Sequence, residues 1–91
     1  MWKVEYRKRF LKELAGLPLH VQARAEKLVF EELHAGENPF ELELLEHMKG
    51  YPGKYKIRIG QYRIGVSLNK KDRLIICERI AHRKDIYKLF S

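Results

Sequence analysis

The chain has 91 residues, of which 45% are hydrophobic and 34% are charged. A chain this short cannot bury two separate apolar cores, so we expect one folded domain over residues 1–91. Nineteen Lys and Arg against twelve Asp and Glu give a formal net charge of +7. This excess favours a polyanionic partner, namely nucleic acid, an acidic protein or a membrane surface, although a basic surface can also serve solubility alone.

The N-terminal residues and the single cysteine indicate a cellular compartment. Residues 1–7 carry a charge at every second position from Lys3 onward, a pattern typical of neither a signal peptide nor a membrane span. Cys77 is the single cysteine, which excludes an internal disulfide, and it lies in an apolar run, which indicates a buried structural thiol. We therefore expect a cytoplasmic protein that does not contact a membrane.

A strand and a first helix are predicted at the start of the chain. Trp2, Val4 and Tyr6 alternate with charged residues, which is the period-two pattern of a strand with one buried face. Apolar residues at helical spacing follow, and Pro18 blocks continuation of this helix. The first helix should therefore end near Gly16.

A second helix is predicted from Leu19 to His34, because its apolar residues form a single stripe. Gly36 suits the left-handed cap just past its end. Asn38-Pro39 then turns the chain into a connector that runs to about Met48. The two helices are expected to form a hairpin that covers a sheet.

Three further strands are predicted in the second half. After a bend at residues 50–53, residues 54–59 alternate in polarity, and Gly60-Gln61 favours a tight hairpin turn. The next strand is residues 62–68, and residues 74–80 read as a strand that is apolar on nearly both faces.

Residues 81–90 are ambiguous between a short helix and an ordered tail. The order β-α-α-β-β-β predicts an α+β fold with a mainly antiparallel sheet of about four strands, and with the helical hairpin packed on it.

The predicted turn at Gly60-Gln61 gathers positive charge on one face of two strands. Four cations share that face: Lys54, Lys56, Arg58 and Arg63. Like charges opposite each other destabilise a sheet by roughly 0.2–1 kcal/mol per pair. We interpret the face as a surface for phosphates, with Gly65 and Ser67 leaving open space for a ligand. The alternative is that the side chains extend into water and bind nothing.

Three polar residues after the last strand, His82, Arg83 and Tyr87, are close enough in sequence to reach the same surface. Alternatively, His82 is a surface residue and Tyr87 packs its ring on the core. The histidines are scattered without metal-ligand spacing, so we expect no metal and no cofactor. Chemistry by Lys, Arg, Tyr and His suits RNA, because its own 2′-hydroxyl can act as the nucleophile.

Two segments resemble a known family. A glycine bend followed by Tyr55-Lys56-Ile57-Arg58 and Tyr62-Arg63 is similar to one motif of the RelE/ParE toxin superfamily, and residues 82–87, which begin His-Arg and end in Tyr, resemble its terminal signature. The resemblance covers nearly the whole chain. It implies the α+β fold described above and a toxin of a type II toxin–antitoxin system.

RelE-type members cleave messenger RNA in the ribosomal A site, and the resemblance implies the same activity here. It implies that Lys56 activates the 2′-hydroxyl and that Arg63 holds the scissile phosphate. Arg83 matches a second catalytic arginine, and Tyr87 matches a tyrosine that stacks on or orients a base. The implied reaction is an in-line attack of the 2′-hydroxyl on the adjacent phosphorus without a metal, which leaves a cyclic phosphate and a 5′-hydroxyl.

The chain departs from RelE at two positions. Arg58 replaces a lysine, and because arginine is a poor proton shuttle we assign it, with Lys54, to phosphate binding. His82 resembles other branches of the superfamily, in which a terminal histidine has been implicated as the general acid. The proton donor stays open among His82, Arg83 and Tyr87.

Two other functions remain possible on the same fold. One is a ParE-type toxin, a non-catalytic inhibitor of DNA gyrase, and the other is an inactive member that only binds RNA or an antitoxin. The resemblance also implies a cognate antitoxin as partner, and DNA is expected to be contacted only through the antitoxin complex.

Overall fold

The protein is described from a computed structural model that covers residues 2–35 and 45–90. Its strands are β1 (Lys3–Tyr6), β2 (Leu45–His47), β3 (Lys54–Ile59), β4 (Tyr62–Asn69) and β5 (Leu74–His82). They form one five-stranded sheet in the order β1-β5-β4-β3-β2. Strand β1 runs parallel to β5, and the other neighbours are antiparallel. The predicted α+β fold with a mainly antiparallel sheet is confirmed.

Strand β2 is the element that the sequence pattern missed. It lies inside the stretch predicted as a connector to about Met48, and it places Leu45 opposite Ile57 on β3. A strand of three residues is too short to show an alternating pattern. The sheet therefore has five strands where about four were predicted.

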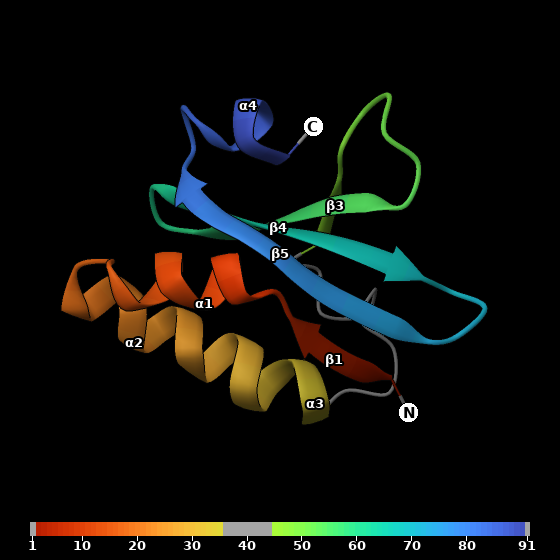
Figure 1. The fold of residues 1–91 in the computed structure, drawn as a ribbon, viewed down its shortest axis with the longest axis horizontal. Helices are drawn as coiled ribbons and strands as arrows, with labels where there is room; N and C mark the ends of the chain where they lie inside the picture. The colour runs from red at the N-terminus through yellow and green to blue at the C-terminus, as the bar shows by residue number, and fades with distance from the viewer. Residues whose placement is uncertain (1, 36–44, 91) are drawn as a thin grey trace.

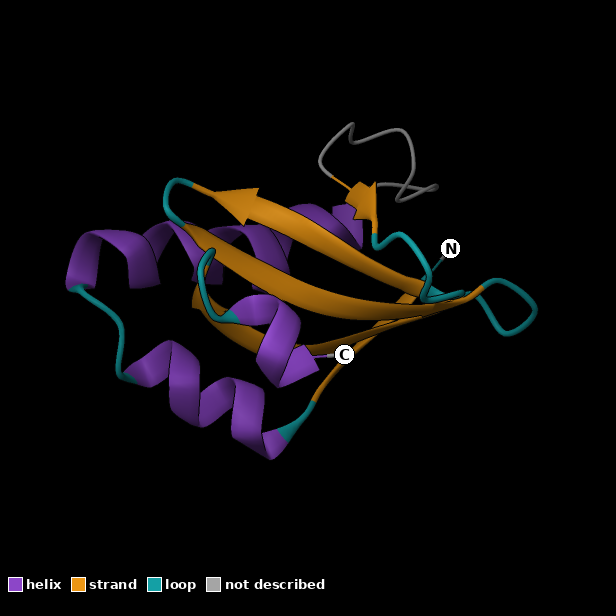
Figure 2. Ribbon diagram, turned by 90° about the horizontal axis from the view of Figure 1, so that it is seen from above, coloured by secondary structure: helices purple, strands orange, loops and turns teal. Residues whose placement is uncertain are grey.

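Helices lie on both sides of the sheet (Figure 1). One side carries α1 (Lys8–Ala15), α2 (Leu19–Lys27), a π-helical turn (Leu28–Glu32) and α3 (Leu33–Ala35), and the other side carries α4 (Ile86–Phe90). Seen from above in Figure 2, α4 lies over the strands close to the C-terminus. Within residues 2–35 and 45–90, none of the helices combines the length and apolar character needed to cross a bilayer.

The helical predictions are largely confirmed. The first helix ends at Ala15, directly before Gly16, and the second extends through residues 19–35 with a π-helical turn in its middle. The ambiguous C-terminal segment contains a helix of five residues. The predicted cap at Gly36 and the turn at Asn38-Pro39 lie outside the described residues.

The main core lies between the sheet and the helices α1, α2 and α3. The sheet contributes the buried residues Ile57, Ile59, Ile64, Val66, Leu68, Ile75, Cys77 and Ile80. The helices contribute Phe10, Leu14, Val21, Ala25, Leu28, Val29 and Leu33. This buried apolar area is the dominant favourable contribution to folding.

A β-bulge in β5 explains why its sequence reads as apolar on nearly both faces. Val66 pairs with Cys77 while Gly65 pairs with Arg79, so Glu78 is an extra residue on β5. The extra residue shifts the alternation by one position. Cys77 before the bulge and Ile80 after it therefore both point into the main core.

Tyr6 secures the π-helical turn to β1. Its hydroxyl donates to the carbonyl of Val29 at 2.6 Å and lies 2.9 Å from Nε2 of His34. Its ring also contacts Phe10 and Phe30. Burial, with a smaller contribution from Cys77, raises the pKa of Tyr6 to about 12. The neutral hydroxyl is thus the form that satisfies a carbonyl of the irregular turn.

The β3–β4 hairpin has the predicted register. Gly60 adopts a positive φ of +56° at the first central position of the turn, a conformation that glycine tolerates without steric cost. Arg58 lies opposite Arg63, and Lys56 lies opposite Gly65. The predicted alternation, which places the cations of β3 and β4 on one face, is therefore confirmed.

Cys77 offers a test of the core. Burial, with a smaller contribution from Glu78, raises the pKa of its thiol to about 12, so the reactive thiolate is scarce in the folded state. We expect iodoacetamide at about pH 8 to alkylate the native protein at least ~100-fold more slowly than the unfolded protein. A Cys77→Ala/Lys71→Cys variant, with its thiol in the exposed β4–β5 turn, is the control and should react quickly. Equal rates for the two native thiols would contradict this packing.

Candidate functional site

Helix α4 lies on the cationic face of the sheet. Phe90 places its ring directly on Gly65, where a Cβ atom would come within 2.6 Å of the ring. Met48, Ile86 and Phe90 form a second small core, with Ala81 packed against it. The expectation that Gly65 leaves open space for a ligand is therefore wrong, because an aromatic ring fills that space.

Ser67, the other residue expected to leave open space, is also engaged. Its hydroxyl donates to Oε2 of Glu78 at 2.8 Å, and Oε1 of the same carboxylate accepts from Nε of Arg7 at 3.2 Å. The bulged residue of β5 thus brings a carboxylate to Ser67.

Lys54 holds the C-terminal end of α4. Its Nζ donates to the carbonyl of Phe90 at 2.7 Å and lies 4.9 Å from the centroid of the same residue's ring. A second ring, that of Tyr51, has its centroid 5.6 Å away. A cation at this helix end satisfies a free carbonyl and complements the helix dipole. The structure thus gives Lys54 a structural contact, whereas the sequence predicted only phosphate binding.

Lys56 and Tyr87 are in direct contact on this face. Lys56 Nζ donates to the Tyr87 hydroxyl at 2.7 Å and lies 4.6 Å from the centroid of its ring. Glu46 of β2 approaches the same Nζ at 3.8 Å. Lys56 keeps 17% of its side chain exposed, whereas Tyr87 is 44% exposed. The amino group of the largely buried Lys56 side chain therefore lies beside an aromatic ring that faces solvent.

Arg58 on β3 lies opposite Arg63 on β4, but the two side chains make different contacts. Arg63 turns its Nη1 back to the carbonyls of Gly60 and Tyr62, at 2.9 Å each. Arg58 is exposed. Because a guanidinium carries five N–H donors, Arg63 keeps donors for an anion after these two contacts.

The structure separates His82, Arg83 and Tyr87, and His82 is the final residue of β5. Tyr87 contacts Lys56, as described above. The backbone N–H of Arg83 donates to the carbonyl of Gln61 at 2.8 Å, so the exposed Arg83 lies next to the turn of the β3–β4 hairpin. His82 pairs with Tyr62, 5.7 Å between ring centroids, and its Nδ1 accepts from the Lys84 amide. The bulge places His82 on the face of the main core, away from Lys56.

Sequence analysis missed Glu46 and Phe90 as members of this site. Glu46 belongs to the short strand that the pattern did not reveal, and Phe90 to the segment that was ambiguous between helix and tail. The spacing of Ile86 and Phe90, four residues apart, is the signal that indicates one apolar side of a helix turn.

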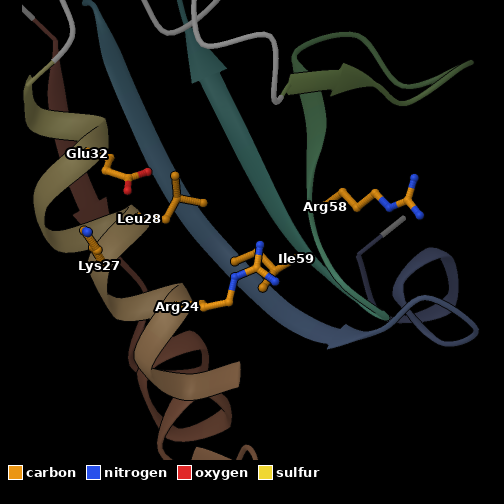
Figure 3. A pocket seen from close by; sticks show the side chains of 6 residues that line it. All are labelled: Arg24, Lys27, Leu28, Glu32, Arg58 and Ile59. Carbon is orange, nitrogen blue, oxygen red and sulfur yellow. The ribbon is translucent and has the colours of Figure 1, made fainter. Parts of the chain in front are cut away.

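Two cavities border β3 on the side of α2. The larger, of about 360 Å³, is lined by Arg24, Lys27, Leu28, Glu32, Arg58 and Ile59. Figure 3 shows the Arg58 side chain pointing away from those of Arg24 and Lys27. A second cavity of about 240 Å³ shares Arg24 and Ile59 and reaches the hairpin turn. Neither cavity is lined by Lys56 or Tyr87, which lie on the open face. Among the described residues, no cluster of His, Cys, Asp and Glu could hold a metal ion.

The family of the chain follows from comparison with known proteins. A family model described as the ParE toxin of the type II toxin–antitoxin system parDE matches residues 4–87. The chain belongs to the RelE/ParE superfamily of type II toxins. Toxin RelE3 of Methanocaldococcus jannaschii is 40% identical over 89 residues, which are 97% of this chain and 98% of that protein.

Solved structures of this superfamily share the fold. A chain in the RelB–RelE antitoxin–toxin complex from Methanococcus jannaschii is 38% identical, with a TM-score of 0.76, and the match covers 96% of this chain and 99% of that one. A chain in the archaeal RelE–RelB complex from Pyrococcus horikoshii OT3 is 26% identical, with a TM-score of 0.63, over 90% and 94% of the two chains. The predicted membership and fold class are confirmed.

The contact of Gly65 with Phe90 yields a prediction for this RelE/ParE toxin. Gly65→Ala should destabilise the protein by about 1–3 kcal/mol, because the added methyl forces the ring and α4 to shift. Urea unfolding measures the loss. Gly16→Ala is the matched control, since its Cβ would meet no atom closer than 3.7 Å. Equal stability of the two variants would show that Phe90 does not lie on Gly65.

Proposed function

We propose that this type II toxin is a ribosome-dependent endoribonuclease that cleaves messenger RNA in the A site without a metal. The observation that carries the proposal is the contact between Lys56 Nζ and the Tyr87 hydroxyl on an exposed face. The family supplies the activity class, since RelE-type toxins cleave messenger RNA. The net charge of +7 supports a polyanionic substrate.

In the proposed reaction the 2′-oxygen forms a bond to the adjacent phosphorus while the bond to the 5′-oxygen breaks. Lys56 acts as the general base: its nitrogen, as a neutral amine at this step, accepts the proton of the 2′-hydroxyl as the new bond forms. Tyr87, with its exposed ring, orients a base by stacking. The products are a cyclic phosphate and a 5′-hydroxyl.

The arginines stabilise the charge that develops on the phosphate. Arg63 keeps N–H donors for this purpose, and Arg58 and Arg83 are both exposed. The departing 5′-oxygen takes up a proton, for which we retain Tyr87 and Arg83 as donors. We leave His82 out of this proposal, because its ring packs against that of Tyr62.

A cognate antitoxin is the proposed partner, since RelE relatives of this chain have been solved in complex with RelB antitoxins. An acidic segment of the antitoxin would match the basic face by charge. We propose that the toxin acts in the cytoplasm and contacts DNA only through the antitoxin complex.

Inhibition of DNA gyrase is the second candidate function, because the matching family model is that of the ParE toxin. This function needs no nucleophile and no Lys56–Tyr87 pair. The two candidates therefore differ in whether transcripts are cut.

Mapping of transcript ends in cells tests the proposal. Induction of the wild-type toxin should produce cuts within translated frames, and Lys56→Ala should lower their number at least ~100-fold, since one positioned acid–base group contributes about 10²–10⁴-fold. Lys71→Ala removes an exposed lysine from the β4–β5 turn and is the matched control, with cuts unchanged.

Three other outcomes would contradict the proposal. Cuts that persist with Lys56→Ala would remove this residue from the reaction. Growth arrest with intact transcripts would favour gyrase, and neither arrest nor cuts would indicate a member that only binds.

A further inference from the structure

A charged pair lies at the edge of the sheet where β1 stops short of β5. The last residue of β1, Tyr6, is opposite Cys77, so β5 continues beyond its parallel partner. Oε1 of Glu13, from α1, accepts the backbone N–H of Ile80 at 3.2 Å. Glu13 thus replaces the missing strand at this amide.

The same carboxylate binds the guanidinium of Arg79. Nε of Arg79 lies 3.1 Å from both oxygens of Glu13, and Nη2 lies 2.6 Å from Oε2. The side chains are only 12% and 23% exposed. The hydrogen bonds that Arg79 donates to Glu13 raise the pKa of Arg79 above its usual range. A bidentate pair of this kind fixes the orientation of the guanidinium as well as its position.

The remaining nitrogen of Arg79 reaches α4 on the other side of the sheet. Its Nη1 donates to the carbonyl of Leu89 at 3.2 Å, next to the Phe90 carbonyl that Lys54 holds. Helix α4 has five residues, too few to be stable without outside contacts. Its last carbonyls have no partner within the helix. Two cations therefore hold two successive carbonyls at the end of α4.

We propose that Glu13 and Arg79 are positioning residues for Tyr87, and that they set the placement of α4 on the sheet so that the Tyr87 hydroxyl meets Lys56. Glu13 lies in the helical hairpin and Tyr87 in α4, so the pair connects the two sides of the sheet through Arg79. Neither residue touches the reacting atoms. The consequence for cleavage rests on the proposed function, whereas the consequence for the position of Tyr87 does not.

Arg79→Lys tests the pair. A lysine keeps the positive charge, but its single ammonium group cannot replace a fork that binds a carboxylate and a carbonyl together. The readout is the chemical shift of the Lys56 ε-methylene protons, which lie beside the Tyr87 ring. We expect it to move at least half of the way toward its value in Tyr87→Leu, where the ring is absent. On ribosomes, kcat for messenger RNA should fall about 10- to 100-fold with KM nearly unchanged.

Two further variants separate positioning from stability. Glu13→Gln keeps an acceptor for the Ile80 amide but loses the charged pair, so it should shift the same protons, and the double variant should add little. Arg7→Lys is the matched control, because Arg7 forms an ion pair with Glu78, the residue before Arg79 on β5, rather than with Glu13.

An unchanged proton shift in folded Arg79→Lys and Glu13→Gln would overturn the inference, as would an equal shift in Arg7→Lys. The inference is supported if the chemical shift of the Lys56 protons changes in Arg79→Lys and in Glu13→Gln but not in Arg7→Lys. If the wild-type protein cuts no RNA while the shift still moves, the positioning role stands and the proposed nuclease activity fails.

Discussion

Phe90 packs its ring on the backbone of Gly65, and this contact brings α4 onto the face of the sheet that α1, α2 and α3 leave open. Tyr87 belongs to the same short helix, so its hydroxyl reaches Lys56 only while α4 lies there. Any side chain at position 65 would displace the ring. The lack of a Cβ at one residue of β4 is thus the constraint on which the Lys56–Tyr87 pair depends.

The cations of this face divide into two groups. Lys54 and Arg79 donate hydrogen bonds to the last carbonyls of α4. These carbonyls carry partial negative charge, which reduces the repulsion between the cations of this face. Arg58 and Arg63 keep donors that an RNA phosphate can use. A surface that reads as uniformly basic in sequence therefore contains structural cations that place the helix and others that keep donors for a ligand.

Local patterns predicted much of the fold. The positive φ that the turn requires at Gly60 fixed the hairpin register, and alternation assigned each cation of β3 and β4 to its face. The helices followed from the spacing of apolar residues and from Pro18. These features depend on neighbours in sequence, so they are visible without the tertiary structure.

Two contacts over longer distances were not predictable. Gly65 and Phe90 lie 25 positions apart, so nothing local shows that an aromatic ring fills the space above the glycine. The bulge at Glu78 reverses the alternation of β5, and His82 consequently faces Tyr62 rather than the cationic surface. A single inserted residue moves every later side chain to the other face.

The most direct test is cleavage of messenger RNA on purified ribosomes by the isolated toxin, with a single 2′-deoxy nucleotide placed 5′ to the scissile phosphate. The account predicts that the all-ribose message is cut to a 5′-hydroxyl end and that the deoxy-substituted message stays intact at that position, because its nucleophile is missing. Equal cleavage of both messages would contradict attack by the 2′-hydroxyl and, with it, the role assigned to Lys56.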